Sequence, residues 1–337
     1  MRLTVRIARA ALAIVLVGSF ALAGCSAADE TPETEAPGTE APAATPAEMT
    51  IGTLATQDSL PLWVAEQEGY FTTEGMPSVE IVTFQSAQEC QAAFTSGAVD
   101  ALMTDIIVAA KLHQSGTPVV IPTVMLGAET AEGRFAIVAA PDSGVKTMND
   151  LAGVKVGVGS ATVTELVLDK LMAEAGVPAA DVAKEEVPKM PVRFQLLMSG
   201  QLKAASLPEP FVSLAVLQGA SVVEGGDDTQ AAENVSQSVL VVSAEYAGTD
   251  EGEAAVDALL AAWNSAVADI AVSPDSYRGT LVTKANLPQP LAESYAVSRY
   301  PVATEPSVEQ VQMVLDWMTE RGYLEGELLP DELLGWE

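Results

Sequence analysis

The feature that most constrains the fold is an alternation of short apolar runs with helical stretches, spaced as in parallel βαβ units. The stretch from Thr50 to Phe71 shows the pattern once: an apolar strand over Ile51 to Leu54, a polar loop, and a helix opened by Pro61. Proline suits a first helical turn, where its missing N–H would have no partner, and Gly69 is placed to end the helix. The loop therefore follows the carboxyl end of a strand, which is where open α/β sheets bind small ligands. An ordinary βα unit without a ligand has the same pattern.

The pattern repeats along the chain and divides it into two successive α/β sets. Further strands are expected at 79–84, 101–103, 119–124, 135–140, 154–158, 185–187, 203–207 and 238–243. The sets join at about 136–141 and rejoin at about 236–243, which predicts lobe 1 over 49–136 plus 241–337 and lobe 2 over 137–240. The 289 residues from Met49 onward are enough for two cores.

Helix signals complete this pattern. Thr162-Val163-Thr164-Glu165 and Ser307-Val308-Glu309-Gln310 match the capping box at the start of a helix. Helices are also expected over 251–272 and 290–298, and the helical tail is expected to pack back onto the first set.

The first 24 residues have the features of a targeting segment. Arg2, Arg6 and Arg9 precede an apolar run at 10–23, which is shorter than the ~20 residues that span a bilayer. The run ends in Leu22-Ala23-Gly24-Cys25, which resembles the lipobox of bacterial lipoproteins, in which the cysteine becomes the acylated first residue. We therefore expect an extracytoplasmic protein, lipid-anchored to the bacterial membrane through Cys25.

Composition limits the partners. Residues 25–48 are rich in Pro, Ala, Thr and Glu and are interpreted as a disordered tether. Removing residues 1–24 removes three arginines and no acidic residue, so the formal charge changes from −30 to −33. A surface this acidic repels nucleic acid and anionic headgroups. With Cys25 acylated, Cys90 has no disulfide partner and is expected to be a small buried hydrophobe.

Several segments in succession resemble one family. They are 61–76 (PLWVAEQEGYFTTEGM), 96–100 (SGAVD), 149–157 (NDLAGVKVG), 199–205 (SGQLKAA) and 207–210 (LPEP). In this order they resemble the ABC-importer solute-binding proteins for thiamine precursors, aliphatic sulfonates, taurine and nitrate. The resemblance implies a two-lobed α/β fold of the periplasmic-binding-protein type II, each lobe a mostly parallel sheet flanked by helices, with two crossing strands.

The same resemblance implies a function and partners. It implies a monomer without a cofactor that captures a small organic ligand between its lobes and delivers it to an ABC permease and its ATPase. A surface sensor or scavenger lipoprotein of the same fold remains an alternative. A lyase-type enzyme that uses Glu209 or Asp58 is a further one.

The loops at the strand ends provide the expected ligand-binding side chains. They are Gln57, Asp58, Ser59, Trp63, Gln85, Ser86, Thr104 and Asp105 in lobe 1, and Ser160, Ala161, Thr162, Arg193 and Glu209 in lobe 2. Each has a structural alternative. Asp58, Ser59, Asp105 and Thr162 can be helix caps, Trp63 can be a core residue, and residues 160–161 can form a tight turn. Arg193 can form a surface salt bridge and Glu209 an interlobe hydrogen bond.

The charges of these candidates favour one kind of ligand. Asp58, Asp105 and Glu209 are accompanied by a single nearby cation, Arg193. This balance favours a neutral or amine-bearing ligand.

Common catalytic arrangements find little support in the sequence. His113 is the only histidine, and there is no G-x-S-x-G motif. The composition excludes metal sites built from His and Cys clusters, and no carboxylate loop pattern is present. Gly157-Val158-Gly159 lacks the third glycine of a nucleotide-binding loop, and no Gly-Lys-Ser/Thr of a P-loop occurs. The sequence therefore predicts a binding protein without a metal or a catalytic site.

Overall fold

A computed structural model describes residues 44–129, 132–231 and 238–336. The predicted targeting segment, Cys25 and the tether up to residue 43 lie outside these ranges. Ala47 and Glu48, at the end of the predicted tether, are hydrogen-bonded to the folded chain. Ala47 N donates to Glu251 O over 2.9 Å, and Glu48 O accepts from the Tyr246 hydroxyl over 2.8 Å.

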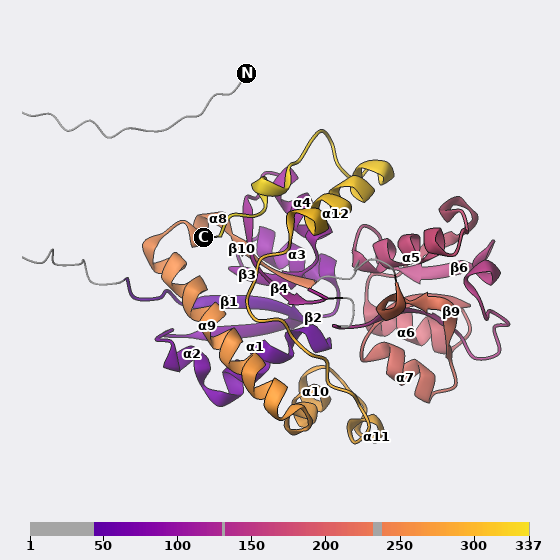
Figure 1. Ribbon diagram of the computed structural model, residues 1–337, viewed down its shortest axis with the longest axis horizontal. Coiled ribbons are helices and arrows are strands. Elements are labelled where there is room, and N and C mark those ends of the chain that lie inside the picture. The colour runs from indigo at the N-terminus through magenta and orange to yellow at the C-terminus, as the bar shows by residue number, and fades with distance from the viewer. Residues whose placement is uncertain (1–43, 130–131, 232–237, 337) are drawn as a thin grey trace, which may run out of the picture. The chain divides into compact units, whose positions relative to one another are not determined.

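Two five-stranded mixed sheets organise the described chain (Figure 1). In the order of the first sheet, the strands are β2 (Val79–Phe84), β1 (Met49–Leu54), β3 (Ala101–Thr104), β10 (Ser238–Ser243) and β4 (Val119–Leu126). The second sheet contains β7 (Ala183–Glu186), β6 (Lys155–Val158), β8 (Ala204–Pro208), β5 (Phe135–Ala139) and β9 (Ser221–Asp227). We call the first sheet with its helices lobe 1 and the second sheet with its helices lobe 2.

One strand in each sheet runs against its neighbours. In lobe 1, β10 is antiparallel to β3 and β4. In lobe 2, β5 is antiparallel to β8 and β9, whereas β6 is parallel to both β7 and β8. The chain passes from β4 of lobe 1 to β5 of lobe 2, and returns from β9 to β10. The antiparallel strands are therefore the ones that follow each change of lobe.

Helices cover both faces of each sheet. They are α1 (Leu60–Glu68), α2 (Tyr70–Thr73), α3 (Ala87–Thr95), α4 (Ile106–Gln114), α8 (Ala244–Ala247), α9 (Asp250–Val272), α10 (Arg278–Lys284), α11 (Gln289–Ala292) and α12 (Val308–Arg321) in lobe 1, and α5 (Val163–Glu174), α6 (Met190–Met198) and α7 (Phe211–Leu217) in lobe 2. One core cluster of lobe 1 joins α1 and α9 to the sheet, and a second joins α3, α4 and α12 to its other face. Lobe 2 also has two clusters, one with α5 and one with α6 and α7.

The predicted strands and the helix ends in lobe 1 correspond well to those observed. Gly69 ends α1 with a left-handed φ of 75°, and Gly322 ends α12 with φ 70°. The capping box at Ser307 is formed. Cys90 is fully buried, and burial raises the pKa of its thiol to about 12. These features depend on local sequence, and local sequence is sufficient to predict them.

Three local predictions need correction. The capping box at Thr162 is absent, because the Thr162 hydroxyl donates to Gly159 O instead, over 2.7 Å. The expected helix over 290–298 is only α11, because the chain turns away after it and contacts Gln57 through Tyr295 and Ser298. The prediction also omitted β9, because its adjacent Gly225 and Gly226 interrupt the alternation of apolar and polar residues typical of a strand. The register of β9 against β5 is also irregular.

The helix α9 is long and apolar enough to cross a membrane by length and composition, and no second such helix occurs in the described ranges. Its Leu259 and Trp263 pack in the core cluster that contains α1. A helix buried along one side of a folded lobe passes the same test.

Candidate functional site

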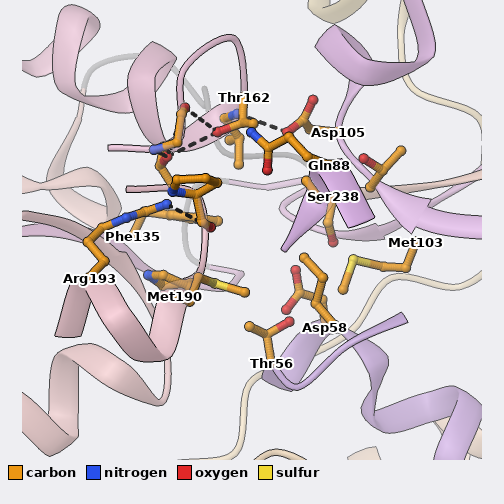
Figure 2. A pocket seen from close by; sticks show the side chains of 18 residues that line it. Thr56, Asp58, Gln88, Met103, Asp105, Phe135, Thr162, Met190, Arg193 and Ser238 are labelled. Carbon is orange, nitrogen blue, oxygen red and sulfur yellow. Dashed lines mark hydrogen bonds between the residues drawn. The ribbon is translucent and has the colours of Figure 1, made fainter. Parts of the chain in front are cut away.

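A small cavity lies where the strand ends of lobe 1 face those of lobe 2 (Figure 2). Its volume is about 50 Å³, enough for a few water molecules or a compact ligand group. Lobe 1 contributes Leu54, Thr56, Asp58, Ala87, Gln88, Met103, Thr104, Asp105 and Ser238, and lobe 2 contributes Phe135, Gly159, Thr162, Val163, Thr164, Pro188, Met190, Arg193 and Pro208. The wall is therefore part apolar and part polar, with acidic side chains from one lobe and a basic side chain from the other.

The local fold explains why these residues meet. Thr56 and Asp58 follow β1, and Asp105 follows β3, so these side chains lie at the carboxyl edge of the first sheet. Gly159 follows β6 in the second sheet and begins the short loop that leads to α5. The carboxyl ends of parallel strands and the starts of the following helices commonly form ligand sites in α/β proteins.

Asp105 joins the two lobes. One carboxylate oxygen accepts from Val108 N over 2.9 Å and caps α4, and the other accepts from Val163 N at the start of α5, also over 2.9 Å. Burial raises the pKa of Asp105, while these two N–H groups act to lower it. The N-terminus of α5 is thus capped by a carboxylate from lobe 1 rather than by its own Thr162.

Asp58 lies in the same cavity without a basic partner. Its residue is 6% exposed, and burial raises its pKa. The hydroxyl of Thr56, the main-chain N–H of Asp58 itself and the hydroxyl of Ser238 act to lower that pKa, but neither hydroxyl makes a hydrogen bond of ordinary geometry with the carboxylate. Among the described residues, no lysine, arginine or histidine forms an ion pair with Asp58.

Arg193 is a buried cation, with 2% of the residue exposed, and it makes no surface salt bridge. Its guanidinium donates to three main-chain carbonyls: Val187 O at 2.9 Å, Ser206 O at 3.0 Å and Pro188 O at 3.4 Å. Burial lowers its pKa to about 9. A Cβ on Gly159 would lie 3.0 Å from an Arg193 terminal nitrogen, so the glycine leaves room for the guanidinium.

Five of the thirteen predicted ligand-binding residues line this cavity. They are Asp58, Thr104, Asp105, Thr162 and Arg193. Ser59, Trp63, Gln85, Ser86, Ser160 and Ala161 lie outside it. Ser59 donates to Leu54 O, Trp63 is buried in the core, and Ser86 caps α3 by accepting from Glu89 N over 3.2 Å.

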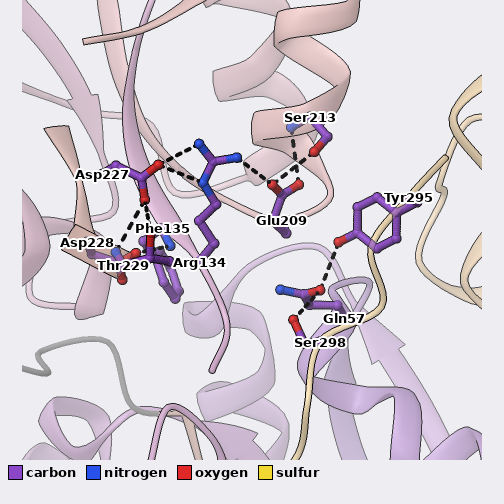
Figure 3. A network of polar contacts seen from close by, with 10 residues as sticks. All are labelled: Gln57, Arg134, Phe135, Glu209, Ser213, Asp227, Asp228, Thr229, Tyr295 and Ser298. Atoms are coloured by element: carbon purple, nitrogen blue, oxygen red, sulfur yellow. Dashed lines mark hydrogen bonds and ion pairs between the residues drawn. The ribbon is translucent and has the colours of Figure 1, made fainter. Parts of the chain in front are cut away.

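The remaining predicted residues, Gln57 and Glu209, line a separate open groove of about 950 Å³. Glu209 accepts from Ser213 Oγ over 2.9 Å and from Arg134 over 3.2 Å (Figure 3). Burial raises its pKa despite that arginine. Arg134 also pairs with Asp227 at 2.6 Å. Arg134 was not among the cations expected near the site, and its position directly before β5 is the only sequence signal that could have indicated it.

Other cavity residues were also missed by sequence reasoning. Gln88, Phe135, Thr164 and Ser238 line the cavity, and of these four only Ser238 has a buried hydroxyl without a partner in the described structure. Ser238 opens β10, about 180 residues after Asp58, so neither spacing nor local pattern connects the two.

In the described part of the chain, neither a cluster of metal-ligating side chains nor the histidine lies at this cavity. No group of three or more His, Cys, Asp or Glu side chains able to hold a metal occurs in the described part of the chain. His113 lies on α4 with Nε2 3.8 Å from Glu332, and it does not line the cavity.

Comparison with known proteins places the chain in a family. A family model described as the NMT1-like family matches residues 42–280, more than two thirds of the chain. The chain belongs to the NMT1-like family. A search of curated proteins finds no match.

Solved structures share the fold. The periplasmic aliphatic sulphonate binding protein SsuA from Escherichia coli is 21% identical, with TM-score 0.70, over 85% of this chain and 97% of that one. The alkanesulfonate-binding protein SsuA from Xanthomonas axonopodis pv. citri, bound to MOPS, is 18% identical, with TM-score 0.72, over 87% and 99%. The nitrate-binding protein NrtA from Synechocystis PCC 6803 is 18% identical, with TM-score 0.68, over 87% and 86%. The two-lobed type II periplasmic-binding-protein fold predicted from the sequence is confirmed.

The same fold also occurs in an enzyme. The desulfurization enzyme DSZB matches with TM-score 0.60 at 15% identity, over 86% of this chain and 95% of that one. The fold by itself therefore does not separate binding from catalysis.

Proposed function

We propose that this protein is a lipid-anchored, extracytoplasmic solute-binding protein that delivers a small organic ligand to an ABC importer. The observation that carries the proposal is the cavity between the lobes, with Asp105 of lobe 1 hydrogen-bonded to the first N–H of α5 in lobe 2. The proposal is also supported by the sulfonate-binding and nitrate-binding proteins that share this fold. In this proposal Cys25 carries the lipid, and the lobe bounds expected from the sequence, 49–136 plus 241–337 and 137–240, shift by a few residues so that all of β5 belongs to lobe 2 and all of β10 to lobe 1.

The proposed mechanism is closure of the lobes around the ligand. A ligand that contacts both walls favours the state in which the lobes meet, since it binds that state better than an open one. Two contacts outside the cavity also join the lobes in the closed state. Lys189 of lobe 2 pairs with Glu89 of lobe 1 at 2.7 Å, and Trp317 of α12 donates to Asp169 of α5 over 3.0 Å. The permease then distinguishes the closed protein from the open one.

A ligand screen by thermal shift tests the proposal. Protein produced from the full chain is unfolded and refolded to remove any copurified ligand, then heated with pyrimidines, sulfonates, nitrate, amines and amino acids. A ligand at about 100 times its Kd stabilises by about 2.7 kcal/mol, which raises Tm by roughly 5 to 11 °C. A saturable rise with one chemical class supports solute binding. The absence of any rise, together with unchanged lobe separation, contradicts it.

The alternatives have their own outcomes in this test. A sensor or scavenger binds the same ligand, but it does not stimulate ATP hydrolysis by a permease and ATPase encoded beside it. An enzyme on this fold converts the bound ligand, which mass spectrometry of the released solute detects.

A further inference from the structure

We propose that the ligand carries a small cationic nitrogen group, an ammonium or an amidinium, that pairs with Asp58. This inference rests on the proposed solute-binding function and specifies its ligand. The starting point is that the Asp58 carboxylate is buried and faces the cavity with no cation beside it (Figure 2). Around it, the hydroxyls of Thr56, Thr104 and Ser238 are also buried without hydrogen-bond partners in the described structure.

The other charged groups of the cavity already have their partners within the protein. Both carboxylate oxygens of Asp105 accept main-chain N–H groups, from Val108 and Val163. The guanidinium of Arg193 donates to three main-chain carbonyls. Asp58 is the charged cavity residue to which the described protein provides no such partner. Because a buried charge is costly unless it is paired and hydrogen-bonded, its missing partner is expected to come from the ligand.

Several of the main-chain donors that would hold an anion are occupied. Helix N-termini bind sulfonate or phosphate groups through free main-chain N–H groups, but here Asp105 takes those of Val108 and Val163. At the start of α3, Ser86 accepts from Glu89 N, and Gly159 N before α5 donates to the Thr164 hydroxyl over 2.9 Å. The geometry therefore favours a cation at Asp58 over an anion at the helix starts.

The cavity volume limits the size of the group. About 50 Å³ holds only a few heavy atoms, so the cavity takes the cationic end of the ligand and the rest of a larger ligand lies outside it. An ammonium or amidinium with a short apolar stem fits, with the stem against Leu54, Met103 and Met190. The hydroxyls of Thr56 and Ser238 can accept the remaining N–H groups.

Isothermal titration calorimetry with matched probes tests the inference. Taurine and isethionate share an ethanesulfonate frame and differ only in ammonium versus hydroxyl, while ethylamine and acetamidine carry the cation alone. Ethanesulfonate and nitrate carry only the anion. We expect taurine to bind the unmodified protein at least roughly tenfold more tightly than isethionate, since a hydrogen bond to a charged group contributes about 1.5–3 kcal/mol.

Variants locate the effect. Asp58→Asn keeps the shape of the side chain and removes its charge, so it should reduce the preference for taurine over isethionate by roughly tenfold or more. Asp257→Asn removes the same charge from an exposed position on α9 and should leave the preference unchanged. The ratio of the Kd values for taurine and isethionate is measured on the unmodified protein, so the inference can still be tested if Asp58→Asn does not fold.

The outcomes separate the inference from the function. If ethanesulfonate or nitrate binds as tightly as taurine, and Asp58→Asn changes neither, solute binding stands and the cation at Asp58 is refuted. If no cationic probe and no other class in the thermal screen binds, both the inference and the proposed function are refuted.

Discussion

Replacing Asp105 by alanine should separate the two roles of its carboxylate. The bond to Val108 N caps α4, and losing such a cap costs about 1 kcal/mol of stability. The bond to Val163 N crosses between the lobes, and a charge-assisted hydrogen bond of this kind contributes about 1.5–3 kcal/mol. The first loss should appear in global unfolding. The second should appear as lobe opening, because separation lets water reach the freed Val163 N–H.

Two measurements distinguish these effects. Urea unfolding should show a loss of about 1 kcal/mol for Asp105→Ala, and a similar loss for the control Thr249→Ala, whose hydroxyl caps α9 and bonds to Tyr246 O, both within lobe 1. Lobe separation is followed by energy transfer between dyes on cysteines introduced at the exposed positions Thr72 and Lys155. The native thiol of Cys90 should not compete, because burial raises its pKa to about 12.

Only the Asp105 variant should shift the open-to-closed ratio, by roughly 10- to 150-fold for 1.5–3 kcal/mol. Equal dye separation in Asp105→Ala and Thr249→Ala would refute the idea that this carboxylate holds the lobes together.

Three further predictions concern the anchor, the pH dependence and the packing. Cys25→Ala should release the protein from the membrane fraction into the soluble fraction; retention there would contradict the lipid anchor. Burial acts to raise the pKa of Glu165, but hydrogen bonds, among them one from Lys184, outweigh burial and lower this pKa below its usual value. The ionised Glu165 carboxylate therefore stabilises the folded protein above pH 4.5, and this stabilisation is lost as pH falls through the folded pKa. Urea unfolding between pH 6 and 3 should therefore show a smaller pH dependence in Glu165→Gln, and an identical profile would contradict this assignment. Gly52→Ala places a Cβ 2.6 Å from Cys90 Sγ and should cost about 1–3 kcal/mol; the double variant with Cys90→Ala should recover most of this in thermal unfolding, and no recovery would show that the strain lies elsewhere.

The α5–α12 contact gives the Glu165 prediction its structural setting. Glu165 and Asp169 on α5 of lobe 2 meet Lys184 at 2.7 Å each. From lobe 1, the Tyr323 hydroxyl donates to Glu165 over 2.9 Å, and Arg321 forms an ion pair with Asp169. Protonation of Glu165 thus weakens a contact between the lobes as well as one within lobe 2, and acid should also favour opening.

The sequence was sufficient for the elements and for the two-lobed fold. Apolar runs, Gly69 and Gly322 as helix ends, and the Ser307 capping box depend on residues a few positions apart, and they appear as predicted. The resemblance to the solute-binding family agrees with the NMT1-like match and with the solved structures. Where local signals were ambiguous, as at β9 with its adjacent glycines, the prediction was incomplete.

What the sequence determined by itself was therefore the order of strands and helices and the set of loops from which a site could be built. Only the tertiary structure decided which loop residues share a cavity. It places Asp58 beside Ser238 and turns Glu209 toward Arg134, in a different groove. It also caps α5 with Asp105 instead of Thr162. The physical reason is that a polar side chain takes whichever donor or acceptor folding brings nearest. For buried groups that partner commonly lies on a distant segment, which local sequence does not specify.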